Sequence, residues 1–236
     1  MCSLLYGCES WLTEQFKKLE KFYIGALKAL LGVRETTRTD VVLIESGMPT
    51  LKEFIRKKTA SFVKKNVRGD IDETPLAKVY KMCERSRTPG YVHIKRMLDY
   101  PEKNLHDLKL RLTNEAGNKA TTYREINASL SVHPVYRSNR YIDERKRVVF
   151  TKFRTSSHSL KVETGRWSRV LRENRLCGCG VGVQDEHHVV FDCAKSEDVR
   201  LKYGINVEVY GSVGELMDNH DCVDLVDFVN ECMQLF

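Results

Sequence analysis

The sequence predicts a mainly α-helical protein in which a helical bundle is followed by a basic helical segment and a small zinc-bound module. Three observations lead to this fold class. Apolar residues recur every three or four positions in several stretches of the 236-residue chain, which is typical of amphipathic helices. Several of these stretches begin with residues that favour a helix start. One stretch, Arg172–Arg200, gathers three cysteines and two histidines, the residue types that bind zinc.

The chain is long enough for one large hydrophobic core or two small ones. Hydrophobic residues make up 42% of it and charged residues 30%, which is typical of globular rather than disordered proteins. The polar, glycine-containing stretch Asn114–Asn118 predicts a domain boundary. Residues 1–113 would form the helical bundle, and residues 119–236 would hold the basic segment, the zinc module (172–200) and an acidic C-terminal helix.

The first predicted helix extends for about five turns between Thr13, an N-cap residue, and Gly32, a C-terminal stop. Its apolar stripe consists of Leu12, Phe16, Leu19, Tyr23, Leu27 and Leu30. The flanks of this helix carry Lys17, Lys18, Lys21 and Lys28, which the simplest interpretation places on a solvated face.

Three further helices complete the predicted bundle. The capping box Thr50–Glu53 starts one that runs to about Val67. Pro75 starts the next, which ends before Pro89. A shorter helix covers Tyr91–Leu98.

In the second half, a helical run is expected at about Asn139–Ser156, with core-facing residues Ile142, Val149 and Phe153. Phe150 is also expected in the core. After the zinc module, Ser196 begins a short helix that ends at Gly204, and an amphipathic helix covers Cys222–Phe236.

The predicted zinc ligands are Cys177, Cys179, His188 and Cys193. Gly178 and Gly180 let the backbone fold so that the first two thiols can reach one ion. His187 is the neighbouring candidate, and only one of the two histidines is expected to bind. His188 is favoured because Val189–Phe191 can then pack below the site. Four protein donors leave no open position for water, so the zinc is expected to be structural.

Charge is distributed unevenly along the chain, whose formal net charge is +7. The basic segment, Arg137–Arg175, carries twelve Lys/Arg and four Asp/Glu, whereas Ala194–Phe236 carries three and nine. This polarity suits a polyanion on one face. The expected contacts with RNA or DNA are Arg145, Lys146, Arg147, Lys152, Arg154, Arg166, Trp167 and Arg169, of which the cations neutralise phosphates. For Trp167, stacking of the indole ring on an unpaired base and an ordinary position in the core are both open.

Two runs of the sequence resemble non-LTR (LINE-type) retrotransposon polyproteins. The run from Phe150 to Cys193, with ENRLCGCG and DEHHVVFDC, is similar to their C-terminal region, which carries a Cys-Cys-His-Cys motif after the reverse transcriptase. The runs LLYGCESW and ALKALLGVRETTRTDVVLIESGMPTLKEF resemble the thumb region that follows the polymerase palm. The resemblance covers most of the chain in the family's order and makes residues 1–113 thumb-like.

The resemblance implies a C-terminal fragment of a retrotransposon reverse transcriptase that binds RNA or DNA, with the upstream polymerase domain as a further partner. The chain is not expected to be an enzyme, because two-metal polymerases need paired palm carboxylates and this sequence contains no Asp-Asp pair. The alternative is a protein-interaction module in which zinc only stabilises the fold.

No membrane partner is expected, because no apolar run approaches the roughly 20 residues of a membrane helix. The start of the chain has no basic region or cleavage site typical of a signal peptide. An intracellular location follows, where the 8 cysteines would stay reduced or bind metal.

Overall fold

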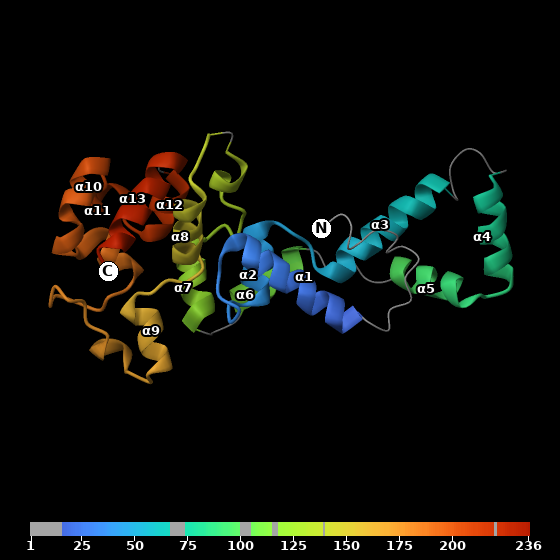
Figure 1. The fold of residues 1–236 in the computed structure, drawn as a ribbon, viewed down its shortest axis with the longest axis horizontal. Coiled ribbons are helices and arrows are strands. Elements are labelled where there is room, and N and C mark those ends of the chain that lie inside the picture. The colour runs from blue at the N-terminus through green and yellow to red at the C-terminus, as the bar shows by residue number, and fades with distance from the viewer. Residues whose placement is uncertain (1–15, 67–73, 100–104, 115–117, 139, 220) are drawn as a thin grey trace. The chain divides into compact units, whose positions relative to one another are not determined.

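The computed structural model describes residues 16–66, 74–99, 105–114, 118–138, 140–219 and 221–236. The regular elements in these ranges are helices, and one isolated antiparallel bridge joins Leu176 to Val183 (Figure 1). The predicted mainly α-helical class is therefore confirmed. None of the described helices is both long and apolar enough to cross a membrane.

The chain divides into two compact units. Unit 1 comprises residues 1–23 and 48–108, and unit 2 comprises residues 24–47 and 109–236. Helices α1 (Phe16–Leu31) and α6 (Leu105–Asn114) each supply residues to both units. Residues 24–47, which the sequence assigned to the N-terminal region, cluster with unit 2. The predicted boundary at Asn114–Asn118 lies partly outside the described residues. Leu12 and Thr13, assigned to the first predicted helix, lie entirely outside them.

Unit 1 contains α3 (Leu51–Asn66), α4 (Pro75–Arg85) and α5 (Pro89–Leu98). The Thr50 hydroxyl accepts a hydrogen bond from the backbone N–H of Glu53 at 3.2 Å, as the predicted capping box requires. Thr74 and Thr88 cap α4 and α5 in the same way. Helix α3 packs against α5, and four of its buried side chains recur every fourth residue: Leu51, Ile55, Thr59 and Val63.

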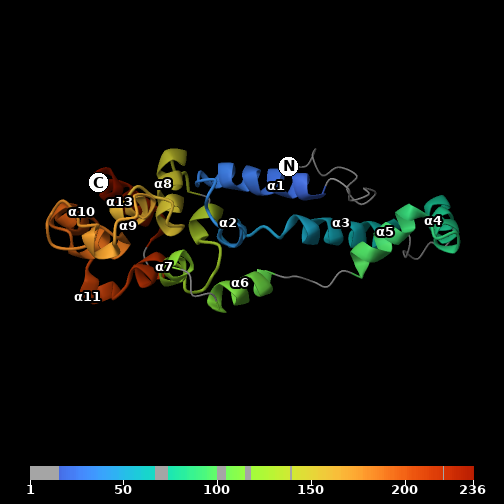
Figure 2. The same cartoon turned by 90° about the horizontal axis from the view of Figure 1, so that it is seen from below.

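Unit 2 holds the larger core. Its helices are α2 (Thr39–Ser46), α7 (Asn118–Ile126), α8 (Glu144–Arg154), α9 (Lys161–Trp167), α10 (Glu197–Tyr203), α11 (Val207–Tyr210), α12 (Val213–Asn219) and α13 (Cys222–Gln234). Figures 1 and 2 both show α13 beside α8 and α10, and these pairs are in contact. Phe150 and Phe153 from α8 and Phe228 from α13 are fully buried, which confirms the core positions predicted for the two α8 residues.

A buried ion pair joins α2 to α8 inside unit 2. Arg154 Nε donates to Glu45 Oε1 at 2.7 Å, and the two side chains are 1% and 0% exposed. The hydroxyl groups of Tyr123 and Tyr136 donate to the two oxygens of the same carboxylate, each at 2.8 Å. Burial by itself would lower the pKa of Arg154, but the attraction of Glu45 outweighs it and the pKa is raised. This network fixes residues 24–47 to the C-terminal half of the chain.

Two helix predictions need correction. Leu30, placed on the apolar stripe of α1, is 63% exposed, whereas Leu31 is buried. The sequence also gave no sign of α2. Six consecutive residues of this helix, Asp40–Glu45, are buried, so its apolar residues show no helical period.

Candidate metal centre

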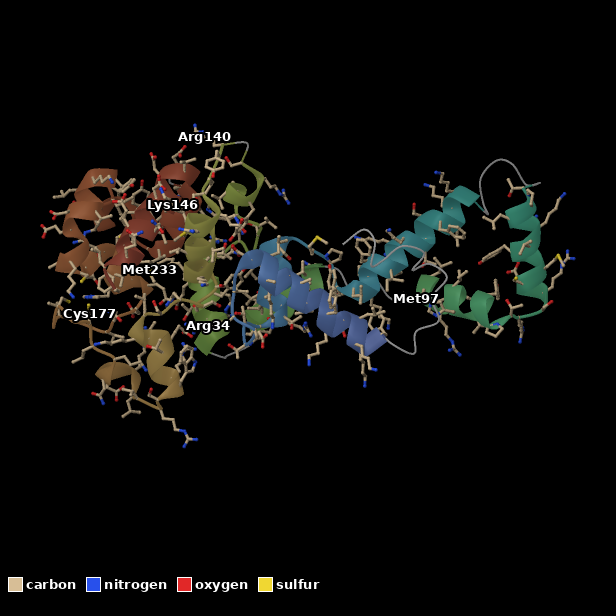
Figure 3. All side chains as sticks on the ribbon, viewed as in Figure 1. Arg34, Met97, Arg140, Lys146, Cys177 and Met233 are labelled. Carbon is tan, nitrogen blue, oxygen red and sulfur yellow. The ribbon has the colours of Figure 1, made fainter. Side chains whose placement is uncertain are left out.

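Two of the predicted ligands lie on a tight loop stabilised by backbone hydrogen bonds. The N–H of Cys177 donates to Gly182 O at 2.7 Å, and the N–H of Gly180 donates back to Cys177 O at 3.0 Å. Gly180 has a φ of +82°, a conformation that glycine adopts without steric cost. The turn therefore brings the Cys177 and Cys179 side chains to the same side of the loop, as the two glycines predicted. Cys177 is labelled in Figure 3.

The other two ligands lie at the ends of a single π-helical turn, His188–Asp192. The N–H of His188 donates to Asp185 Oδ1 at 3.0 Å, and the N–H of Cys193 donates to His188 O at 2.8 Å. Between them, Val189 and Val190 are fully buried in the core of unit 2. The packing predicted for this run is confirmed, and the core fixes the position of both ligands.

The four donor atoms of Cys177, Cys179, His188 and Cys193 lie within 4.8 Å of one another, so this cluster could hold a metal ion. The sulfurs of Cys177 and Cys193 are 3.8 Å apart, and Cys179 Sγ lies 3.2 Å from His188 Nε2. Two thiolates on a tetrahedral zinc with bonds of about 2.3 Å would be about 3.8 Å apart. The donor set and its spacing therefore fit zinc.

His187 lies outside the cluster. Its side chain is 50% exposed, and Nδ1 lies 3.2 Å from Asp192 Oδ2. The side chain of His188 is 6% exposed, with Nδ1 4.0 Å from the same carboxylate oxygen. A separation of 4.0 Å is too long for a hydrogen bond, so burial and the 3.2 Å approach of its Nε2 to Cys179 Sγ distinguish His188. The geometry thus favours His188 over His187 as the ligand.

The thiols have contrasting proton affinities. Hydrogen bonds, chiefly from the backbone N–H of Val181, lower the pKa of Cys179 to about 6. Burial raises the pKa of Cys193 to about 11. A bound divalent cation deprotonates a coordinating thiol outright, so both cysteines can serve as thiolate ligands.

A second buried cluster attaches the ligand loop to the chain that precedes α9. Glu186 Oε1 accepts from His158 Nε2 at 2.8 Å and from the Ser156 hydroxyl at 3.2 Å. His158 Nδ1 accepts from the N–H of Leu160 at 3.3 Å, so the proton that the ring donates to Glu186 is on Nε2. The pKa of Glu186, which burial would raise, is lowered by its bond to His158. This carboxylate therefore acts as an anchor for the loop.

Several predicted phosphate contacts are engaged by acids of unit 2. Lys146 is bonded to Asp227 at 2.8 Å, Arg147 to Glu144 at 3.3 Å, and Arg166 to Glu163 at 3.1 Å. The prediction for Arg154 is wrong, because its side chain is 1% exposed and paired with Glu45. A phosphate could reach Arg154 only by opening the core.

The remaining predicted contacts are accessible. Arg145 and Arg169 are exposed, Lys152 is half-buried, and the structure places none of these three side chains in an ion pair with a described residue. Trp167 is 60% exposed, and the guanidinium of Arg34 lies 4.3 Å from its ring centroid. Arg34 also donates to His158 O at 2.6 Å. One face of the indole is therefore backed by a fixed cation, an arrangement suited to stacking a base on the other face.

Sequence reasoning missed two groups of cations. Arg34 comes to Trp167 only through the tertiary fold, and no local pattern could show it. The lysines of α3 had a compositional sign, since six of its sixteen residues are Lys or Arg. A charge count along the chain favours the longer basic segment, which carries twelve Lys/Arg, over the six of α3.

No protein-family model, curated protein or solved structure matches this chain. The resemblance to non-LTR retrotransposon reverse transcriptases accordingly stays a prediction based on the two sequence runs.

Proposed function

We propose that Cys177, Cys179, His188 and Cys193 bind one structural zinc ion and that unit 2 around it binds single-stranded RNA or DNA. The observation that carries the zinc proposal is the convergence of three sulfurs and one imidazole nitrogen within 4.8 Å. Four protein donors are typical of structural sites, whereas catalytic sites keep a position for water. The zinc ion would hold the ligand loop against the core of unit 2.

The zinc proposal is tested by metal analysis of the purified protein. One zinc per chain is expected, and Cys177→Ser should remove it. His188→Ala should also lose zinc, whereas the matched His187→Ala should retain it because that imidazole points outward. A protein that carries no zinc after purification and refolding with zinc, or one that loses zinc only on His187→Ala, contradicts the assignment.

Support for nucleic-acid binding comes mainly from the exposed Trp167 ring backed by Arg34, with Arg169 two residues further along. Aromatic stacking is worth about 1–3 kcal/mol per base and needs an unpaired base. Arg145 and Lys152 add accessible cations on α8. Unit 2 is proposed to prefer single strands, in keeping with its resemblance to the C-terminal region of a retrotransposon reverse transcriptase.

The nucleic-acid proposal is tested by the affinity of the full chain for a single strand and for a duplex of the same length. Trp167→Ala should weaken single-strand binding by about 1–3 kcal/mol with little change in salt dependence. Trp167→Phe is the matched control, because it retains a stacking ring. Equal loss for strand and duplex, or no binding to either, would defeat the proposal.

Another observation favours a protein-interaction module. Around the ligand loop, Leu171, Leu176 and Val181 are 63%, 49% and 76% exposed. Exposed apolar side chains that form a contiguous patch often mark protein-binding surfaces, and these three flank or belong to one short loop. Under this second proposal Leu176→Ser and Val181→Ser would abolish association with a protein partner and leave nucleic-acid binding unchanged.

A further inference from the structure

The strongest uncompensated positive charge of this protein lies in unit 1, outside the basic segment. Unit 1 carries seventeen Lys/Arg against eleven Asp/Glu, and unit 2 carries twenty-two against twenty-one. Nearly the whole formal net charge of +7 therefore belongs to unit 1. Self-repulsion of uncompensated charge destabilises a compact fold, so this surplus points to a polyanionic partner.

Helix α3 concentrates that charge on one side. Its exposed outer face presents four lysines: Lys57, Lys58, Lys64 and Lys65. Lys57 and Lys64 are seven residues apart, as are Lys58 and Lys65, so each pair lies along one line of the helix, and the two lines are one residue, or about 100°, apart. The four lysines together form one broad surface, which we call the α3 lysine face. It extends for about 12 Å at 1.5 Å per residue.

Among the described residues, carboxylates leave most of this face without a partner. Glu53 is the one acidic residue of α3, and it is 1% exposed. Its carboxylate accepts two hydrogen bonds from Arg56, each at 2.9 Å, which together lower its pKa. Of the four lysines, Lys57 lies 3.8 Å from this carboxylate, with 60% of the lysine side chain exposed. Lys64 and Lys65 are in no ion pair with a described residue.

The opposite side of the helix fixes the orientation of these lysines. Leu51, Ile55 and Val63 are 1–3% exposed, and α3 packs against α5. The lysine face is therefore directed away from the core of unit 1. Surface charge that is held on a packed helix can meet an extended polyanion without ordering the backbone first.

The face lacks a stacking platform. The aromatic residues of α3, Phe54 and Phe62, are partly buried, and Lys58 lies 5.6 Å from the Phe54 ring centroid. Recognition through lysines alone reads charge and not bases. A duplex presents one charge per roughly 1.7 Å of its axis, about twice the density of a single strand.

We propose that the α3 lysine face binds the phosphate backbone of double-stranded nucleic acid without sequence preference. This inference deepens the proposed function, on which it rests for the nature of the ligand, and assigns duplex binding to a surface separate from Trp167. The protein then has two nucleic-acid surfaces with opposite preferences, one for paired and one for unpaired strands.

The test measures binding of the full chain to a 20-base-pair duplex and a 20-nucleotide single strand as salt is raised. The test variant replaces Lys57, Lys58, Lys64 and Lys65 with glutamine. Each lost duplex contact should lower the log–log salt slope by about 0.9, so a decrease of about two to four is expected. The same four positions changed to arginine should keep duplex affinity within about twofold, because the charge is retained. Glutamine and arginine have helix propensities close to that of lysine, and circular dichroism would check folding.

A second variant, with Arg145, Lys152 and Arg169 changed to glutamine, separates this inference from the proposed function. It should weaken single-strand binding and leave most duplex binding. An unchanged duplex slope in the α3 glutamine variant overturns the inference, while single-strand binding that still depends on Trp167 leaves the proposed function standing. If the wild type binds phosphatidylserine vesicles through α3 but no duplex, the face is a lipid-binding surface and the inference is wrong. If the wild type binds neither strand nor duplex, both proposals fall together.

Discussion

The basic segment of unit 2 and helix α3 of unit 1 are both rich in cations, yet their surroundings differ. In the basic segment, Lys146, Arg154 and Arg166 each have an acidic partner within unit 2. On α3, the single acid is buried and satisfied by Arg56. Part of the cationic charge of the basic segment therefore serves folding, whereas the exposed lysines of α3 remain accessible. A run of basic residues indicates a nucleic-acid site only when the fold supplies no counter-ions.

Metal removal should give the largest difference between the two regions. Cys193→Ser should release zinc and unfold the ligand loop and the adjoining core of unit 2, because structural zinc contributes about 10–16 kcal/mol of apparent binding free energy in small domains. Helix α3 has no ligand in this site and should keep its amide protection. Hydrogen exchange followed by mass spectrometry would compare residues 188–193 with residues 51–66. Equal loss of protection in both would show that the units do not respond separately.

The buried pair in unit 2 should give the next largest effect. Glu45→Gln leaves the Arg154 guanidinium buried without a countercharge, and breaking such a pair costs about 3–5 kcal/mol. Urea unfolding would measure the loss. Glu208→Gln is the matched control, because this exposed carboxylate forms no ion pair with a described residue, and its cost should stay within about 0.5 kcal/mol. Similar costs for the two variants would mean that the pair contributes little.

The sequence predicted the metal cluster because its ligands are local. Cys177 to Cys193 lie within one short stretch, and the loop glycines and the buried Val189–Val190 explain how the chain brings them together. The helix starts at Thr50 and Pro75 were predictable for the same reason, since caps act within a few residues. Whether a given Lys or Arg is exposed or paired with an acid was not predictable. Arg154 and its partner Glu45 are far apart in sequence, and only the tertiary fold brings them together.

Helix α2 shows the complementary limit of sequence patterns. An amphipathic helix is recognised in a sequence by its one polar face. Helix α2 is instead buried on several sides, since the consecutive residues Val41, Val42 and Leu43 are only 3%, 0% and 2% exposed. Its packing inside unit 2 also explains why residues 24–47 cluster with that unit although they precede α3 in the sequence. A short apolar run of this kind cannot be distinguished from a buried strand by periodicity.

Acid should weaken unit 2 through His133. Burial, reinforced by the nearby Arg154, lowers the pKa of this imidazole from 6.5 to about 4, and its Nε2 lies 2.8 Å from Met217 O. In the unfolded chain the group takes up a proton near pH 6.5, whereas the folded protein resists protonation. The contribution of His133 to the free energy of unfolding is therefore complete above pH 6.5 and is lost as the pH falls towards 4. At about 1.36 kcal/mol per pKa unit, the loss is at most about 3 kcal/mol. Urea unfolding between pH 7 and 4 would show the slope, and His133→Asn should reduce it. A wild-type stability that stays constant over this range contradicts the prediction.

The smallest effects provide the sharpest comparison, because a free and a paired cation are adjacent in α8. Arg145 is exposed and forms no ion pair with a residue that the structure describes, whereas Lys146 donates to Asp227 at 2.8 Å and has a raised pKa because of that bond. Arg145→Gln should lower the log–log salt slope of single-strand binding by about 0.7, the value for one phosphate contact, and leave the urea midpoint unchanged. Lys146→Gln should have the opposite pattern. The salt slope should change little, because Asp227 already neutralises the lysine, and the urea midpoint should fall slightly, because this ion pair joins α8 to α13 (Figure 3). Measuring both variants at the same salt concentrations makes each the control for the other. Equal slopes for the two would show that an acidic partner within the fold does not withdraw a cation from phosphate binding, and the distinction between the basic segment and the α3 lysine face would then fail.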